Sequence, residues 1–176
     1  MLTYKGEQLE ELKEETLESM YAKVVAVALD CDPIPAKDRA DAKLEPPWEV
    51  FARVKASETT LEGRLVALFT EVGTLGANAP STVGFITGIS AVVQKHPEVS
   101  KGTDVFGKEF GRNIVDLIAT ADETDRILQG TTVQSFADLV SSVLAGLGRM
   151  SARGDQSRHV AVAAAFLRLI HTAAQK

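Results

Sequence analysis

The chain has 176 residues, a formal net charge of −5 and a single cysteine, with 45% hydrophobic and 24% charged residues. This length and composition are typical of one globular domain with its own core, and they exclude a disordered or fibrous chain. The acidic balance disfavours nucleic-acid binding, which needs several Lys or Arg to displace counterions from phosphates. Cys31 has no partner for an internal disulfide, so folding does not require an oxidising compartment.

The N-terminal residues run directly into an acidic segment rather than a basic leader followed by an apolar run, which predicts a cytoplasmic protein. The longest uncharged stretch, residues 72–94, is long enough on paper to span a bilayer. Because Gly73, Asn78 and Pro80 interrupt it, we interpret it as core and predict no membrane span.

Apolar residues recur at three- and four-residue steps between residues 7 and 29 and predict a first helix. Pro33 and Pro35 end this pattern, and an irregular Pro-rich connection is predicted at about 30–47. The first helix is acidic, whereas the basic residues gather late in the chain, at Arg149, Arg153, Arg158, Arg168 and Lys176. The asymmetry is compatible with end-to-end self-association or a charged partner, although solvated helix faces are the simpler interpretation.

The next helix begins around Pro46-Pro47-Trp48, because proline is tolerated in a first turn, and Trp48, Phe51 and Val54 should face inward. Thr59 and Glu62 have the spacing of a capping box and predict another helix start. The glycine-containing turn at 73–80 should end that helix.

Further helices are predicted after Ser81, after Thr103 and after Thr131 or Thr132, with a short helical turn at about 123–128. The last helix should run from about 155 to 174, and five of its residues should face inward: Val160, Ala163, Ala164, Leu167 and Ile170. No segment alternates like a strand. The sequence therefore predicts an all-α fold, a single-domain bundle of about six or seven helices over residues 1–176.

Two glycine pairs are each spaced by one helical turn, Gly84 with Gly88 and Gly107 with Gly111. Glycine in a helix interior costs about 1 kcal/mol relative to alanine, so paired glycines indicate close approach of another backbone or a gap for a ligand. Close packing of two helices is the preferred interpretation.

No pattern of residues predicts a catalytic or metal site. Aspartates between 30 and 41 resemble a calcium loop, but Ile34 stands where an oxygen ligand belongs and Pro35 stands where the turn needs glycine. No serine lies in a nucleophile elbow or is tied by spacing to a histidine. The acidic residues Asp122, Glu123 and Asp125 are interpreted as an exposed turn. The histidines have no partner at zinc-ligand spacing: His96, His159 and His171.

We therefore predict a non-enzymatic protein–protein interaction or assembly module, with a protein partner or a second copy of the chain, no catalytic residues, no metal and no cofactor. Trp48 and Phe51 are the predicted interaction anchors, because aromatic side chains beside a Pro-rich connection suit a binding hot spot; ordinary core is the alternative. The second functional hypothesis is a bundle that binds a small apolar ligand or cofactor near the paired glycines. An enzyme with a site assembled from scattered residues is the third.

Overall fold

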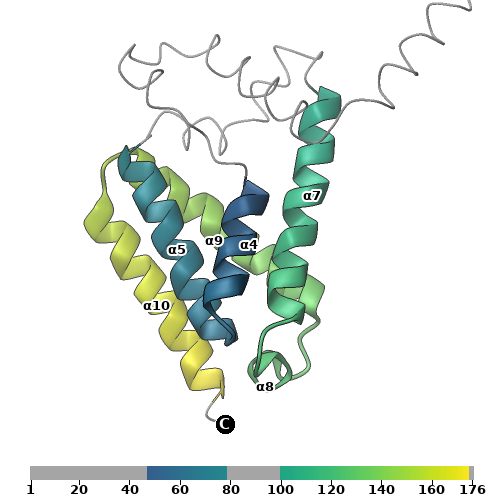
Figure 1. Ribbon diagram of the computed structural model, residues 1–176. Helices are drawn as coiled ribbons and strands as arrows, with labels where there is room; N and C mark the ends of the chain where they lie inside the picture. Colours follow the sequence, from purple (N-terminus) through teal and green to yellow (C-terminus); the bar gives the residue numbers. More distant parts are fainter. Residues whose placement is uncertain (1–46, 79–99, 175–176) are drawn as a thin grey trace, which may run out of the picture.

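The computed structural model describes residues 47–78 and 100–174, which form α-helices and no strand (Figure 1). This confirms the predicted all-α bundle. The predicted first helix, the Pro-rich connection before residue 47 and the helix after Ser81 lie outside the described residues. The described helices are α4 Pro47–Ser57, α5 Leu61–Asn78, α7 Ser100–Ala119, α8 Thr124–Leu128, α9 Val133–Ala152 and α10 Gln156–Ala174.

Helix α5 is central to the bundle, where it packs against α4, α9 and α10 and touches α7 (Figure 1). Its buried residues Leu61, Leu65 and Leu68 follow the three- and four-residue steps of an amphipathic helix. The adjacent Phe69 meets Phe166 of α10 with ring centroids 5.7 Å apart. The helices therefore share one hydrophobic core.

The predicted end of α5 at the 73–80 turn is wrong, because the helix continues to Asn78. Gly73 and Gly76 lie inside it rather than in a turn. Both glycines face close neighbours on α9 and α10, and this packing outweighs their low helix propensity.

The start of α5 also differs from the predicted capping box by one residue. The Thr60 hydroxyl, not that of Thr59, accepts a hydrogen bond from the backbone N–H of Gly63, at 3.1 Å. The backbone of Thr59 is engaged elsewhere, since its carbonyl accepts from the N–H of Asp122 at 2.8 Å. A long-range contact therefore shifts the cap by one position.

In the second half of the chain, α8 and α9 confirm the predicted short turn and the start at Thr132, whose hydroxyl accepts from the N–H of Ser135. Helix α7 begins at Ser100, so the predicted start at Thr103 is wrong by one turn. In α10, Ala163 and Ile170 are buried as predicted, but Val160 is 63% exposed and Ala164 is also exposed.

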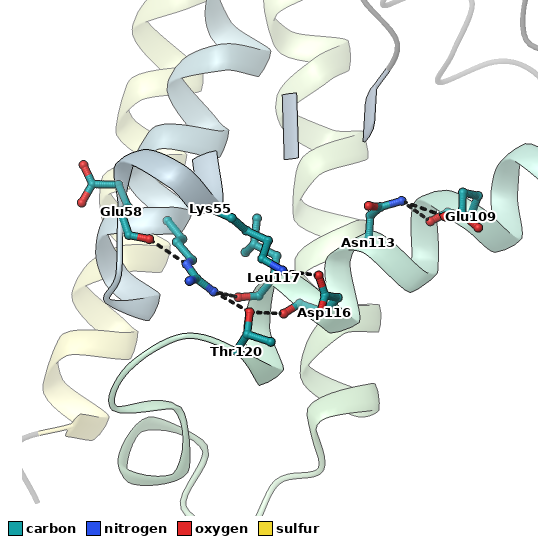
Figure 2. Close-up of polar contacts among 8 residues, drawn as sticks. Lys55, Glu58, Glu109, Asn113, Asp116, Leu117 and Thr120 are labelled. Atoms are coloured by element: carbon teal, nitrogen blue, oxygen red, sulfur yellow. Dashed lines mark hydrogen bonds and ion pairs between the residues drawn. The ribbon is translucent and has the colours of Figure 1, made fainter. Parts of the chain in front are cut away.

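Buried Arg64, in the first turn of α5, connects three elements. Its Nε donates to the carbonyl of Glu58 at 2.9 Å, and its Nη1 donates to the carbonyl of Leu117 at 2.6 Å and to the Thr120 hydroxyl at 2.9 Å. Figure 2 shows these acceptors together, at the end of α4 and the end of α7. A cation suits the carbonyl end of α7 because the helix dipole is negative there.

The connections beside Arg64 are joined by backbone hydrogen bonds. Thr60 and Asp122 form an isolated parallel bridge, in which the N–H of Leu61 donates to the Asp122 carbonyl at 3.3 Å. The buried Thr124 hydroxyl donates to the carbonyls of Ile118 and Ala121. Nearby, Lys55 of α4 pairs with Asp116 of α7 (Figure 2). The α4–α5 and α7–α8 connections are therefore held as one unit.

We expect Arg64→Met to lower the free energy of unfolding by roughly 2–4 kcal/mol, because it leaves buried carbonyl oxygens without a donor. Chemical denaturation monitored by circular dichroism measures this. Arg112→Met is the matched control: the Arg112 side chain is 76% exposed and pairs along its own helix with Glu109, so its loss should cost less than about 1 kcal/mol. Equal losses in the two variants would contradict the role of Arg64.

Candidate functional site

The two aromatic residues predicted as interaction anchors lie in different environments. Phe51 is 3% exposed, and its ring packs edge-on against Phe110 of α7, with centroids 5.4 Å apart and an interplanar angle of 70°. Trp48 is partly exposed in the first turn of α4. Phe51 is therefore closed to a partner in this structure, and the role of Trp48 as an anchor stays a prediction.

The paired glycines are only partly within the described residues, since Gly84 and Gly88 lie outside them. A methyl group built on Gly107 or Gly111 of α7 meets nothing within 4 Å. The described part of the chain thus supplies no neighbour that requires these two glycines, and a ligand gap or close packing at the four positions stays a prediction.

A buried polar cluster joins α5, α9 and α10. The Nδ1 atom of His159 lies 2.9 Å from the Ser151 hydroxyl and 3.2 Å from the carbonyl oxygen of Leu147. Its Nε2 atom lies 3.1 Å from the carbonyl oxygen of Phe69. Each ring nitrogen therefore has a hydrogen-bond partner on a neighbouring helix.

Sequence reasoning did not bring Ser151 and His159 together. Gly154 between them has a φ of 76°, a left-handed conformation that favours glycine and that reverses the chain between α9 and α10. A reversal at this position places residues 151 and 159 at similar heights on neighbouring helices. Gly154 is the sequence feature that indicates this chain reversal, but it does not reveal which side chains face each other.

A serine paired with a histidine is also the arrangement of nucleophilic catalysis, so its surroundings decide its chemistry. Ser151 is 1% exposed and His159 is 4% exposed. The second ring nitrogen faces a backbone carbonyl rather than the carboxylate that orients a catalytic histidine. In this structure the pair therefore fixes three helices against one another and is closed to a substrate.

The space for this cluster comes from Gly73 and Gly76 of α5. A methyl group on Gly73 would lie 2.9 Å from Nε2 of His159, and one on Gly76 would lie 2.0 Å from Cβ of Ser151. At Gly76 the backbone of Ser151 is also within about 3 Å, at 3.0 Å for its carbonyl carbon. Helix α5 can approach α9 and α10 this closely only because both positions lack a side chain.

The acidic residues after α7 lie at the surface. Asp122, Glu123 and Asp125 are exposed, and Glu123 pairs with Arg126 at 2.9 Å within the same turn. Within the described ranges no three or more His, Cys, Asp or Glu side chains are grouped so that they could hold a metal ion.

The outward face of α10 carries both apolar and polar residues. Leu169 is 72% exposed and Val160 is 63% exposed, the two largest exposed fractions among the large apolar side chains of the described part. At about 100° per residue, Val160 and Leu169 point about 180° apart, and the exposed side of α10 between them carries three alanines as well as Arg158, Arg168 and His171. We call the five apolar residues the α10 face: Val160, Ala161, Ala164, Ala165 and Leu169.

Comparison with known proteins gives no relative for this chain: no protein-family model, no curated protein and no solved structure matches it. Among the helices described in 47–78 and 100–174, none has the length and apolar character needed to cross a membrane.

We expect Gly76→Ala to destabilise the protein by about 2 kcal/mol or more, because the added methyl group meets the Ser151 backbone. Gly107→Ala is the matched control: it also adds a methyl group to a helical glycine, but into open space, so it should be neutral or stabilise by up to about 1 kcal/mol. Thermal unfolding of the two variants compares them directly, and similar melting temperatures would contradict the close approach.

Ser151 should resist a fluorophosphonate probe under native conditions, because its hydroxyl is buried and bonded to His159. Intact mass spectrometry after incubation checks this, with a serine hydrolase as a positive control. Native labelling mapped to Ser151 would show that the cluster opens to substrates.

Proposed function

We propose that the protein is an assembly module that associates with a second copy of itself through the α10 face. The observation that supports this proposal is the exposure of Val160 and Leu169 on one helix that also exposes three alanines, Ala161, Ala164 and Ala165, among its polar residues. Exposed apolar residues gathered on one surface are typical of interaction sites, whereas scattered single ones are ordinary. Small residues between them allow a second helix to approach closely.

The buried polar groups favour this proposal over a site for chemistry in the described part. Arg64, Ser151 and His159 each form hydrogen bonds with backbone carbonyls or with one another, and these bonds hold the helices together. What the described surface offers to a partner is therefore apolar area on α10.

The expected affinity is modest. Burying one Val or Leu side chain contributes about 1.5–3 kcal/mol, while association costs about 4–15 kcal/mol in lost translational and rotational freedom. Four such side chains across two copies contribute about 6–12 kcal/mol, so the balance reaches the roughly 8 kcal/mol of a micromolar dimer only when the cost of association is at the low end of its range. Closed two-fold dimers are the commonest soluble assembly, so a dimer is expected.

The double variant Val160→Glu/Leu169→Glu should shift the protein to a monomer, since it places charge on the apolar face. Native mass from light scattering at about 1–100 µM protein measures this. Val66→Glu is the matched control, because Val66 is a 44% exposed residue of α5 outside the α10 face and should leave the dimer intact. A wild-type monomer over the whole concentration range would overturn self-association.

A further inference from the structure

The connection between α7 and α9 contains the short helix α8 and two residues with a strained backbone. Glu123 has a φ of 66° and Gln129 has a φ of 46°, and they stand directly before and directly after α8. They are the two residues of the described part that have a positive φ without being glycine. A Cβ atom in this left-handed region crowds the following carbonyl oxygen, so both residues raise the free energy of the connection.

Both ends of the connection are fixed to the bundle outside the strained residues. On the α7 side, the N–H of Asp122 donates to the carbonyl of Thr59 at 2.8 Å, and the carbonyl of Asp122 accepts from the N–H of Leu61 at 3.3 Å. On the α9 side, the Thr132 hydroxyl caps the first turn of α9. Any movement of α8 that leaves these anchors in place therefore has to rotate the backbone between them, where the two strained residues lie.

Three side chains hold α8 against the rest of the structure. Ile127 and Leu128 are 6% and 7% exposed, and α8 packs against α10 at the end of the bundle where α10 ends (Figure 1). The Thr124 hydroxyl donates to the carbonyls of Ile118 at 2.7 Å and Ala121 at 2.9 Å. Two buried apolar side chains are a small part of the core that the five longer described helices share. Segments with few buried apolar contacts open locally while the rest of a protein stays folded.

We propose that α8 is a strap that opens and closes independently of the bundle, with Glu123 and Gln129 as its hinges. Opening lets both hinges leave the left-handed region, so the strain that they carry in the closed strap favours release. The open strap exposes Ile127 and Leu128 and the surface that they cover, while the anchors at both ends keep the longer helices in place. The proposal goes beyond self-association through the α10 face and does not rest on it.

Native-state hydrogen exchange of the full chain, followed by NMR, tests this proposal. The N–H of Ile127 donates to the carbonyl of Glu123 at 3.0 Å, across the first hinge, so it exchanges when the strap opens. We expect its protection to be at least about tenfold lower than that of the Val140 amide, whose residue is fully buried in α9. Low concentrations of denaturant should accelerate exchange steeply at Val140 and only slightly at Ile127, because opening the strap exposes much less surface than unfolding the bundle. The same protection and the same denaturant dependence at both amides would show that α8 opens only when the bundle unfolds, and would overturn the proposal.

Glycine substitutions test the hinges themselves. Glu123→Gly and Gln129→Gly should each slow the exchange of the Ile127 amide by about two- to fivefold, because glycine adopts a positive φ without the steric cost and so stabilises the closed strap. The matched controls are Glu123→Ala and Gln129→Ala, which remove the same side-chain groups but keep the Cβ atom, so they should not slow this exchange. Circular dichroism melting confirms that each variant folds. Equal exchange rates in the glycine and alanine variants would overturn the assignment of the hinges.

Discussion

The close approach of α5 to α9 and α10 is the constraint on which the rest of the bundle depends. The axes of two packed helices normally lie about 8–10 Å apart, at a distance set by the side chains at the contact. Gly73 and Gly76 remove that spacing on α5, and the imidazole of His159 and the Ser151 side chain take the freed positions. Because α5 also carries the buried leucines and Arg64, its position fixes α4 and the end of α7 as well.

Residues with an unambiguous pattern were predicted correctly from sequence. The start of α9 at Thr131 or Thr132, the short helix α8 and the extent of α10 follow from local signals, namely a hydroxyl before an apolar run and glycines that reverse the chain, and the structure selects Thr132 as the cap. The buried positions Phe51, Val54 and Ile170 follow from periodicity. These features depend on a few neighbouring residues, so local reasoning finds them.

Two of the errors come from contacts between distant residues. Val160 was placed inward by its apolarity, yet His159 takes the inward position because its two ring nitrogens find partners on α5 and α9. Gly73 was assigned to a turn, yet it lies within α5 because it faces the same histidine. One buried polar group thus explains two errors. The pairing of Ser151 with His159 was missed for the same reason, since no spacing rule reports which faces of two helices meet.

The inward placement of His159 instead of Val160 also accounts for the surface of α10. Because adjacent residues of a helix point about 100° apart, turning residue 159 into the core directs residue 160 outward. The hydrogen bonds of the buried cluster therefore hold the Val160 side chain in solvent. Its contact with water is unfavourable unless another surface covers it. A surface fixed by the core in this way is presented rigidly, and a rigid face loses less conformational entropy on binding than a flexible one. The burial of His159 and the exposure of Val160 are thus two consequences of one helix orientation.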